Sequence, residues 1–142
     1  MKVIGIHIDK IKAIFYIVEK DGYGAIKNLT GDFQYLVLKN DTDNSSVREF
    51  QQRVYSFFDK VSPDRIAILA RQTKGRFRSA PLSFKIEGLI QCYEEIEVEF
   101  VSGPKMTAFY RKNELGLVPE FDYQENAAKV AYYVISEIGE QN

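Results

Sequence analysis

Cysteine, histidine and tryptophan are scarce in this sequence of 142 residues, which has one cysteine, one histidine and no tryptophan. The single cysteine, Cys92, excludes a disulfide framework within the chain and favours a reducing compartment. We interpret Cys92, which falls in a predicted helix, as a buried and inert thiol. No zinc spacing, Walker loop, Ser-His-Asp set or dinucleotide glycine fingerprint can be assembled from the remaining residues.

Long hydrophobic runs and a charge excess are also absent. The first apolar run, KVIGIHI, is followed closely by Lys10 and Lys12, so we expect neither a signal peptide nor a membrane span. The formal net charge of -1 argues against a broadly basic nucleic-acid coat, so any attraction for phosphate must come from a local patch. We expect a cytoplasmic protein without membrane contact that forms one domain over residues 1–142.

Hydrophobic periodicity predicts an α/β fold. Strands are expected at residues 2–8, 12–19, 33–39, 66–70 and 97–102, and helices at 46–60, from Pro81 to about 93, and at 123–138. The first three strands have short links and should form an antiparallel meander, whereas the helix before the fourth strand permits a crossover that lays it parallel to the first. The prediction is a five-stranded mixed sheet with helices on both faces and a ligand site where the parallel strands end.

Two of the predicted helices carry clear apolar stripes. Ser46 and Glu49 have the spacing of a capping box at the start of the first helix. Its predicted inward residues are Val47, Phe50, Val54, Phe57 and Phe58. The inward residues of the last helix include Ala127, Ala131, Val134 and Ile135.

A cationic segment lies between the fourth strand and the next helix. It has five cations and no acid, namely Arg71, Lys74, Arg76, Arg78 and Lys85. Gly75 allows close backbone approach, and the start of the following helix attracts anions. A second cationic stretch after the fifth strand has Lys105, Arg111 and Lys112 beside Phe109 and Tyr110, a mixture typical of nucleic-acid contact surfaces. The alternative is ordinary solvated charge, balanced by Glu94, Glu95, Glu97 and Glu99.

The order of elements and several motifs resemble the RNase H-like superfamily and, within it, the RuvC-like branch. GIHID in the first strand is similar to the RuvC-type start, in which an acid follows Gly-Ile or Gly-Val. The segments TKGRFRSAPLSFKIEGLIQ, SSVREFQ and YQENAA are more similar still to an uncharacterised bacterial family of small RuvC-like proteins. The resemblance implies a three-layer RNase H-like fold over essentially the whole chain.

The same resemblance implies which positions would hold metal in a nuclease of this superfamily. Those enzymes bind two divalent ions with carboxylates at the end of the first strand, the end of the fourth strand and on the final helix. Here these positions are His7, Ala70 and Glu125, so two of the three expected carboxylates are absent. We therefore expect neither catalytic residues nor a metal cofactor. The rival interpretations are a hydrogen-bonded core histidine for His7 and, for Glu125, a capping box with Asp122.

These observations leave three functional hypotheses. The first is a catalytically degenerate RuvC-like domain that binds nucleic acid, or a partner complex containing it, through the Lys74 to Lys85 region with Arg71 and Lys105. The second is a nuclease that uses Mg²⁺ or Mn²⁺ with a displaced ligand set of Asp9, Glu125 and Glu87. The third is a homodimeric interaction module whose face uses exposed tyrosines among Tyr16, Tyr35, Tyr55 and Tyr110.

Overall fold

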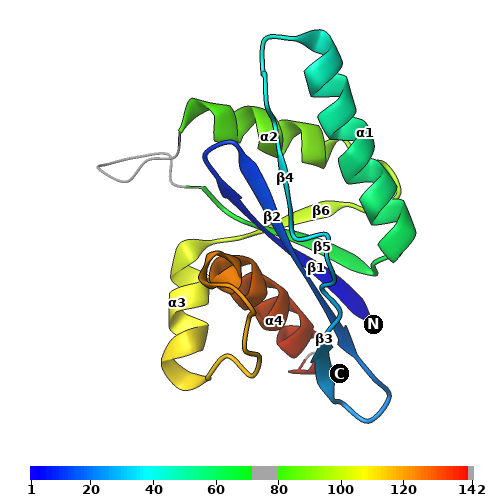
Figure 1. Ribbon diagram of the computed structural model, residues 1–142. Helices are drawn as coiled ribbons and strands as arrows, with labels where there is room; N and C mark the ends of the chain where they lie inside the picture. The colour runs from blue at the N-terminus through cyan, green and yellow to red at the C-terminus, as the bar shows by residue number, and fades with distance from the viewer. Residues whose placement is uncertain (72–79, 141–142) are drawn as a thin grey trace.

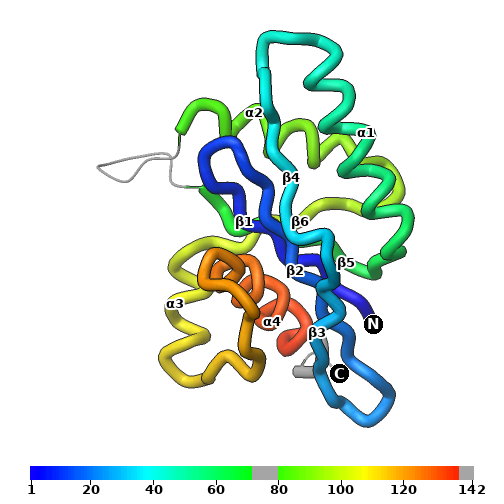
Figure 2. Tube along the Cα trace, in the orientation of Figure 1, coloured from blue at the N-terminus to red at the C-terminus, as the bar shows by residue number. Residues whose placement is uncertain are grey.

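The computed structural model describes residues 1–71 and 80–140 and shows an α/β arrangement of three layers (Figure 1). Within these residues a six-stranded sheet forms the middle layer, with the order β3-β2-β1-β5-β6 and with β4 also paired to β2. Helices α1 and α2 cover one face of the sheet, and α3 and α4 cover the other (Figures 1 and 2). The predicted class, a mixed sheet with helices on both faces, is confirmed.

The strands pair as the sequence predicts, with one short strand more than expected. β1 (Lys2–Asp9) pairs antiparallel with β2 (Lys12–Lys20) along its whole length. β3 (Ile26–Asn28) and β4 (Tyr35–Val37) both pair antiparallel with β2. β5 (Arg65–Leu69) lies parallel to β1, and β6 (Val98–Val101) lies parallel to β5. The three parallel strands therefore end at one edge, which we call the carboxyl edge.

The helices include one that the sequence analysis did not predict. The expected helices are α1 (Asn44–Val61), α2 (Pro81–Gln91) and α4 (Glu125–Glu140), the last preceded by the 3-10 turn η1 (Asp122–Gln124). The additional helix is α3 (Gly103–Lys112), which begins directly after β6. Its start signal is ordinary, because the Ser102 side chain accepts a hydrogen bond from the backbone N–H of Lys105 and Pro104 occupies the first turn.

Both predicted capping boxes are wrong. The N-cap of α1 is Asp43, whose carboxylate accepts from the backbone N–H of Ser45 at 3.2 Å. Ser46 instead accepts from the N–H of Asn40, because an aspartate three residues earlier already starts the helix. At the last helix the oxygen that accepts from the Phe121 N–H, at 3.0 Å, belongs to Gln124, and Glu125 pairs with Lys129 at 3.2 Å.

Two apolar cores lie on either side of the sheet. The stripe predicted for the first helix faces β1, β2 and β5, with four of its residues buried: Phe50, Val54, Phe57 and Phe58. On the other face α4 lies against β1 with small residues between them, because a Cβ added to Gly5 would stand 2.3 Å from the carbonyl oxygen of Ala127. This close packing brings the start of α4 to the carboxyl edge (Figure 1).

Cys92 is exposed, so the expectation of a buried thiol is wrong. The helix ends at Gln91, and the buried residue after it is Tyr93, which packs in the core with α1. None of the helices within residues 1–71 and 80–140 has the length and apolar character needed to cross a bilayer.

Candidate functional site

The carboxyl edge brings together the ends and beginnings of several elements. β1, β5 and β6 end there at Asp9, Leu69 and Val101, and α2 and α3 begin there. Parallel sheets bind ligands at this edge because the loops that follow the strands converge on it. The residues that occupy the edge therefore determine what the protein can bind.

His7 lies on the face of β1 that α4 covers, since Gly5, two residues earlier, packs against α4. The imidazole is half-buried, and its Nδ1 atom has no hydrogen-bond partner in the part of the chain that the structure describes. Burial lowers the pKa of His7 below its usual 6.5, and the charge of Asp9 only partly opposes this shift. His7 is therefore neutral at pH 7, and the hydrogen bond expected of a core histidine is missing at Nδ1.

Ala70 follows the last residue of β5, where its N–H donates to the carbonyl of Val101 at 2.8 Å. The β1–β5 register pairs Ile6 with Ile68, so the next residue, Leu69, lies beside His7 and packs in the same core as α4. Neither Leu69 nor Ala70 offers a metal ligand. Whichever of them faces His7, β5 supplies no carboxylate to the carboxyl edge.

The acids of the displaced ligand set do not come together. Glu125 is exposed at the start of α4 and paired with Lys129, and Asp9 is exposed at the end of β1. Glu87 belongs to α2, on the opposite face of the sheet from α4. Among the described residues no three His, Cys, Asp or Glu side chains are close enough to hold a metal ion, and residues 72–79 contain no acid. These residues do not fit a pair of divalent ions.

Glu87 is instead the buried partner of Arg71. Its side chain is 7% exposed and accepts a hydrogen bond from the Arg71 guanidinium, which also lies 4.1 Å from the centroid of the Phe84 ring. A buried carboxylate of this kind requires a cationic partner. Arg71, predicted to bind anions, therefore has its charge compensated within the protein and joins the end of β5 to α2.

Two cations at the carboxyl edge are exposed. Lys10 stands in the β1–β2 turn, and Lys105 stands in the first turn of α3. The ammonium of Lys85 is also exposed but donates to the backbone carbonyl of Asp41. The other predicted anion-binding residues, Lys74, Gly75, Arg76 and Arg78, lie outside the described residues.

The aromatic residues of the second cationic stretch pack inside the protein. Phe109 and Tyr110 are half-buried between α3 and α4, and the Tyr110 hydroxyl donates to the carbonyl of Lys129 at 2.7 Å. Burial raises the pKa of this hydroxyl above its usual range. Arg111 and Lys112 end α3, about 15 Å from its start for a helix of this length. Of this stretch, only Lys105 lies at the carboxyl edge.

An exposed cluster of aromatic rings lies beside this edge, and the sequence analysis missed it. We call Tyr35, Phe121 and Tyr123 the edge aromatic cluster; their exposed fractions are 42%, 42% and 40%. Phe121 stacks on Tyr123 with centroids 5.5 Å apart, and Tyr123 meets Tyr35 edge to face at 5.7 Å. Lys12 lies over the Tyr35 ring at 4.8 Å. The available signal was FDY, since residues two apart in extended chain point the same way.

The homodimer hypothesis loses most of its predicted surface. Tyr16 is fully buried, and Tyr55 and Tyr110 are half-buried, with their hydroxyls hydrogen-bonded to backbone carbonyls. Of the four tyrosines named for this face, only Tyr35 is exposed.

Comparisons with solved structures identify the fold. RuvC of Thermus thermophilus superimposes with a TM-score of 0.70 at 15% identity, covering 98% of this chain and 97% of that one. The yeast mitochondrial Holliday junction resolvase Ydc2 gives 0.59 at 10% identity, with 94% and 75% covered. The fowlpox virus resolvase with its substrate Holliday junction DNA gives 0.57 at 11% identity, with 97% and 99% covered. The RuvC-like, RNase H-like fold predicted from the sequence is confirmed.

At the level of sequence, a family model described as "Protein of unknown function (DUF3010)" matches residues 1–134. No curated protein matches.

Proposed function

Because this chain belongs to the family described as "Protein of unknown function (DUF3010)" and has a RuvC-like fold, we propose that its carboxyl edge binds nucleic acid without metal-dependent cleavage. The observation that carries the proposal is the make-up of that edge. Exposed cations and exposed aromatic rings gather there, whereas carboxylates do not.

Phosphate contacts are the role we assign to the cations. Lys10 follows β1 and Lys105 follows β6, and these strands lie two strand spacings apart, about 10 Å. The segment between Arg71 and Ala80, which adds Lys74, Arg76 and Arg78, starts and ends at the same edge. α2 also begins there without a side-chain cap, so its first N–H groups add to the attraction for anions.

Unpaired bases are the partners we assign to the edge aromatic cluster. Exposed rings stack on bases of any sequence, and a neighbouring cation such as Lys12 strengthens the contact with a nucleic acid strand. The cluster borders the end of β1, where Asp9 pairs with Lys12. A strand held through its phosphates at Lys10 therefore has rings within reach for its bases.

Loss of cleavage is proposed because of residue types. A two-metal nuclease needs several oxygen ligands around one point, and here the positions on β1 and β5 carry an imidazole, a methyl group and an isobutyl group. The nearest acids are either paired with cations or belong to opposite faces of the sheet.

Fluorescence anisotropy with a labelled four-way DNA junction tests the proposal. We expect salt-sensitive binding that weakens about fivefold to tenfold in the double variant Lys10→Ala/Lys105→Ala and at least as much in Lys74→Ala/Arg76→Ala/Arg78→Ala. The matched control is Lys20→Ala/Lys27→Ala, which removes two cations from the other end of β2 and from β3. Equal losses in the control and the edge variant would contradict the assignment. Cleavage of the junction in Mn²⁺ by the unchanged protein would refute the second half of the proposal.

The same assay separates base stacking from phosphate binding. Phe121→Ala/Tyr123→Ala should weaken binding to a single strand about tenfold and leave blunt duplex binding nearly unchanged. Tyr23→Ala is the control, because this ring is 99% exposed in the turn after β2. If the single strand and the duplex lose affinity alike, the rings do not stack on bases.

A further inference from the structure

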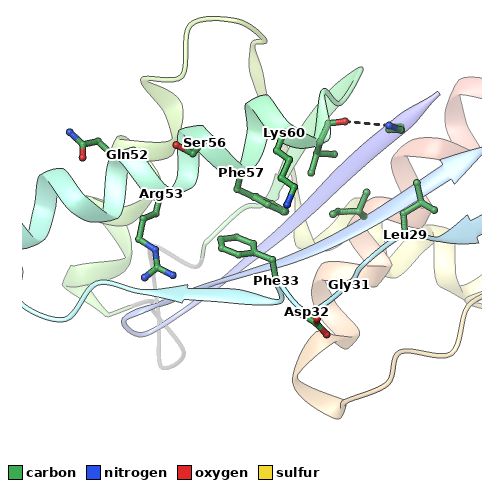
Figure 3. Close-up of a pocket in the computed structure, with 12 residues that line it drawn as sticks. Leu29, Gly31, Asp32, Phe33, Gln52, Arg53, Ser56, Phe57 and Lys60 are labelled. Carbon is green, nitrogen blue, oxygen red and sulfur yellow. Dashed lines mark hydrogen bonds between the residues drawn. The ribbon is translucent and has the colours of Figure 1, made fainter.

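A second cavity lies away from the carboxyl edge, on the face of the sheet that α1 covers (Figure 3). Its volume is about 840 Å³, and it opens between α1 and the segment of residues 29–33 that joins β3 to β4. Lys2, the first residue of β1, and Val61, the last residue of α1, border it. The cavity is therefore at the end of β1 opposite to His7 and Asp9.

The inner wall of this cavity is apolar and built from packed rings. Phe33 stacks on Phe57 with centroids 4.2 Å apart and an interplanar angle of 27°, and both rings also contact Phe15 in the core. Ile17 of β2 contributes a buried aliphatic side chain. Core packing fixes this wall, so it presents a preformed surface to an apolar ligand.

The rim of the cavity is cationic. Arg53 and Lys60 are seven residues apart on α1 and therefore lie on one side of the helix, about 10 Å apart along its axis. Figure 3 shows both side chains extending from α1 toward the segment that carries Phe33. Within the described residues neither side chain has an ion pair or a hydrogen bond.

No acid neutralises this rim from inside the cavity. Asp32 is the one acidic residue among the lining residues, and its carboxylate points away from Lys60 and Phe57 (Figure 3). The ammonium of Lys2 already donates to the carbonyl of Val61 at 3.4 Å. Arg53 and Lys60 thus leave two uncompensated positive charges above an aromatic wall, with the hydroxyl of Ser56 between them on the same helix.

We propose that this cavity binds a small organic anion with an aromatic or branched aliphatic body and a carboxylate or phosphate group. The body would lie against Phe33 and Phe57, and the anionic group would meet Arg53 or Lys60. The volume falls within the range of small-molecule sites, roughly 300 to 1,000 Å³, and the lining has their usual character of an apolar surface with few polar groups. This inference goes beyond nucleic-acid binding, because no residue of the carboxyl edge takes part.

The charge requirement is tested with two probes of the same shape, indole-3-acetate and the uncharged indole-3-acetamide, in NMR titrations of the full chain. We expect indole-3-acetate to shift the amide signals of Phe33, Ser56 and Lys60 and to bind about fivefold to tenfold more tightly than the amide. Equal affinity of the two probes, or shifts confined to other residues, would overturn the proposal.

Variants then assign the two parts of the site. Arg53→Ala/Lys60→Ala should abolish the preference for the acid while leaving amide binding unchanged, and Phe33→Ala should weaken both probes. Arg48→Ala is the matched control, because this exposed cation of α1 does not line the cavity. Its affinity for both probes should stay as it is, and amide spectra outside the cavity show whether each variant is folded. Binding of an acidic peptide containing phenylalanine, but of neither indole probe, would identify a protein-docking surface and contradict the small-molecule assignment.

Discussion

Tyr16 holds a polar atom in the core without a partner. Its side chain is fully buried on the α4 face of β2, and in the described part of the chain its hydroxyl makes no hydrogen bond. Burial accordingly raises the pKa of Tyr16 above 10.0. A buried hydroxyl without a partner costs free energy, since water satisfies it in the unfolded chain.

Removing this hydroxyl should stabilise the protein. We expect Tyr16→Phe to raise the free energy of unfolding by about 1 kcal/mol in urea denaturation. The comparison is Tyr93→Phe, which removes a 2.6 Å hydrogen bond to Asp59 from another buried tyrosine and should lower the same quantity by about 1 kcal/mol. If Tyr16→Phe also destabilises, the hydroxyl has a partner that the packing does not reveal.

His7 should make stability depend on pH in a definite direction. Because burial lowers its pKa in the folded state, the unfolded chain binds the proton more readily below about pH 6.5. Its contribution to stability is therefore complete above that pH and is lost as the pH falls toward the folded-state pKa, by at most about 1.4 kcal/mol per pH unit.

The measurement is the difference in unfolding free energy between the wild type and His7→Asn. This difference should become smaller between pH 7.5 and pH 5.5, since only the wild type carries the titrating group. A difference that grows on acidification would show that a protonated His7 is stabilised by a nearby carboxylate.

At the scale of elements, the contact between β1 and α4 depends on a residue without a side chain. A Cβ at position 5 would stand 2.3 Å from the carbonyl oxygen of Ala127 and 2.6 Å from the backbone nitrogen of Ala131. Both neighbours are backbone atoms of a helix, so neither can move alone. The contact also sets where the start of α4 meets the carboxyl edge.

Gly5→Ala should therefore lower the free energy of unfolding by about 3 kcal/mol or more, because overpacking moves α4 off the sheet. Gly88→Ala is the matched control: Gly88 lies within α2, nothing lies within 4 Å of the added Cβ, and alanine favours the helix by up to about 1 kcal/mol. Thermal and urea denaturation of both variants would show opposite signs. A tolerated Gly5→Ala would contradict the close approach of α4 to β1.

Elements with long apolar patterns were predictable from the sequence, and short ones were not. The alternation in β1 and β2 and the stripe of α1 gave correct strands and a correct helix because many residues repeat the same signal. β3 has three residues, of which Lys27 and Asn28 are exposed, so no periodicity marks it. α3 buries only Met106 fully, and its cations resemble those of a basic loop.

At the scale of the whole molecule, the sequence indicated the fold and the missing carboxylates, but not how side chains pair across the sheet. His7 and the end of β5 lie together because the parallel register of β1 and β5 follows from the crossover through α1. The pairing of Arg71 with Glu87 was not predictable, because sixteen residues of sequence separate them and only the packing of α2 brings them into contact. The edge aromatic cluster likewise joins residues from β4 and from the segment before α4.

The salt dependence of junction binding tests the central claim most directly. Each phosphate contact at the carboxyl edge contributes about 0.9 to the slope of log affinity against log salt concentration. We expect Lys10→Ala/Lys105→Ala to reduce this slope by about 2 relative to the unchanged protein, while Lys20→Ala/Lys27→Ala leaves it the same. A slope that is unchanged in the edge variant, or binding that does not respond to salt, would contradict the claim that this edge of the sheet binds nucleic acid.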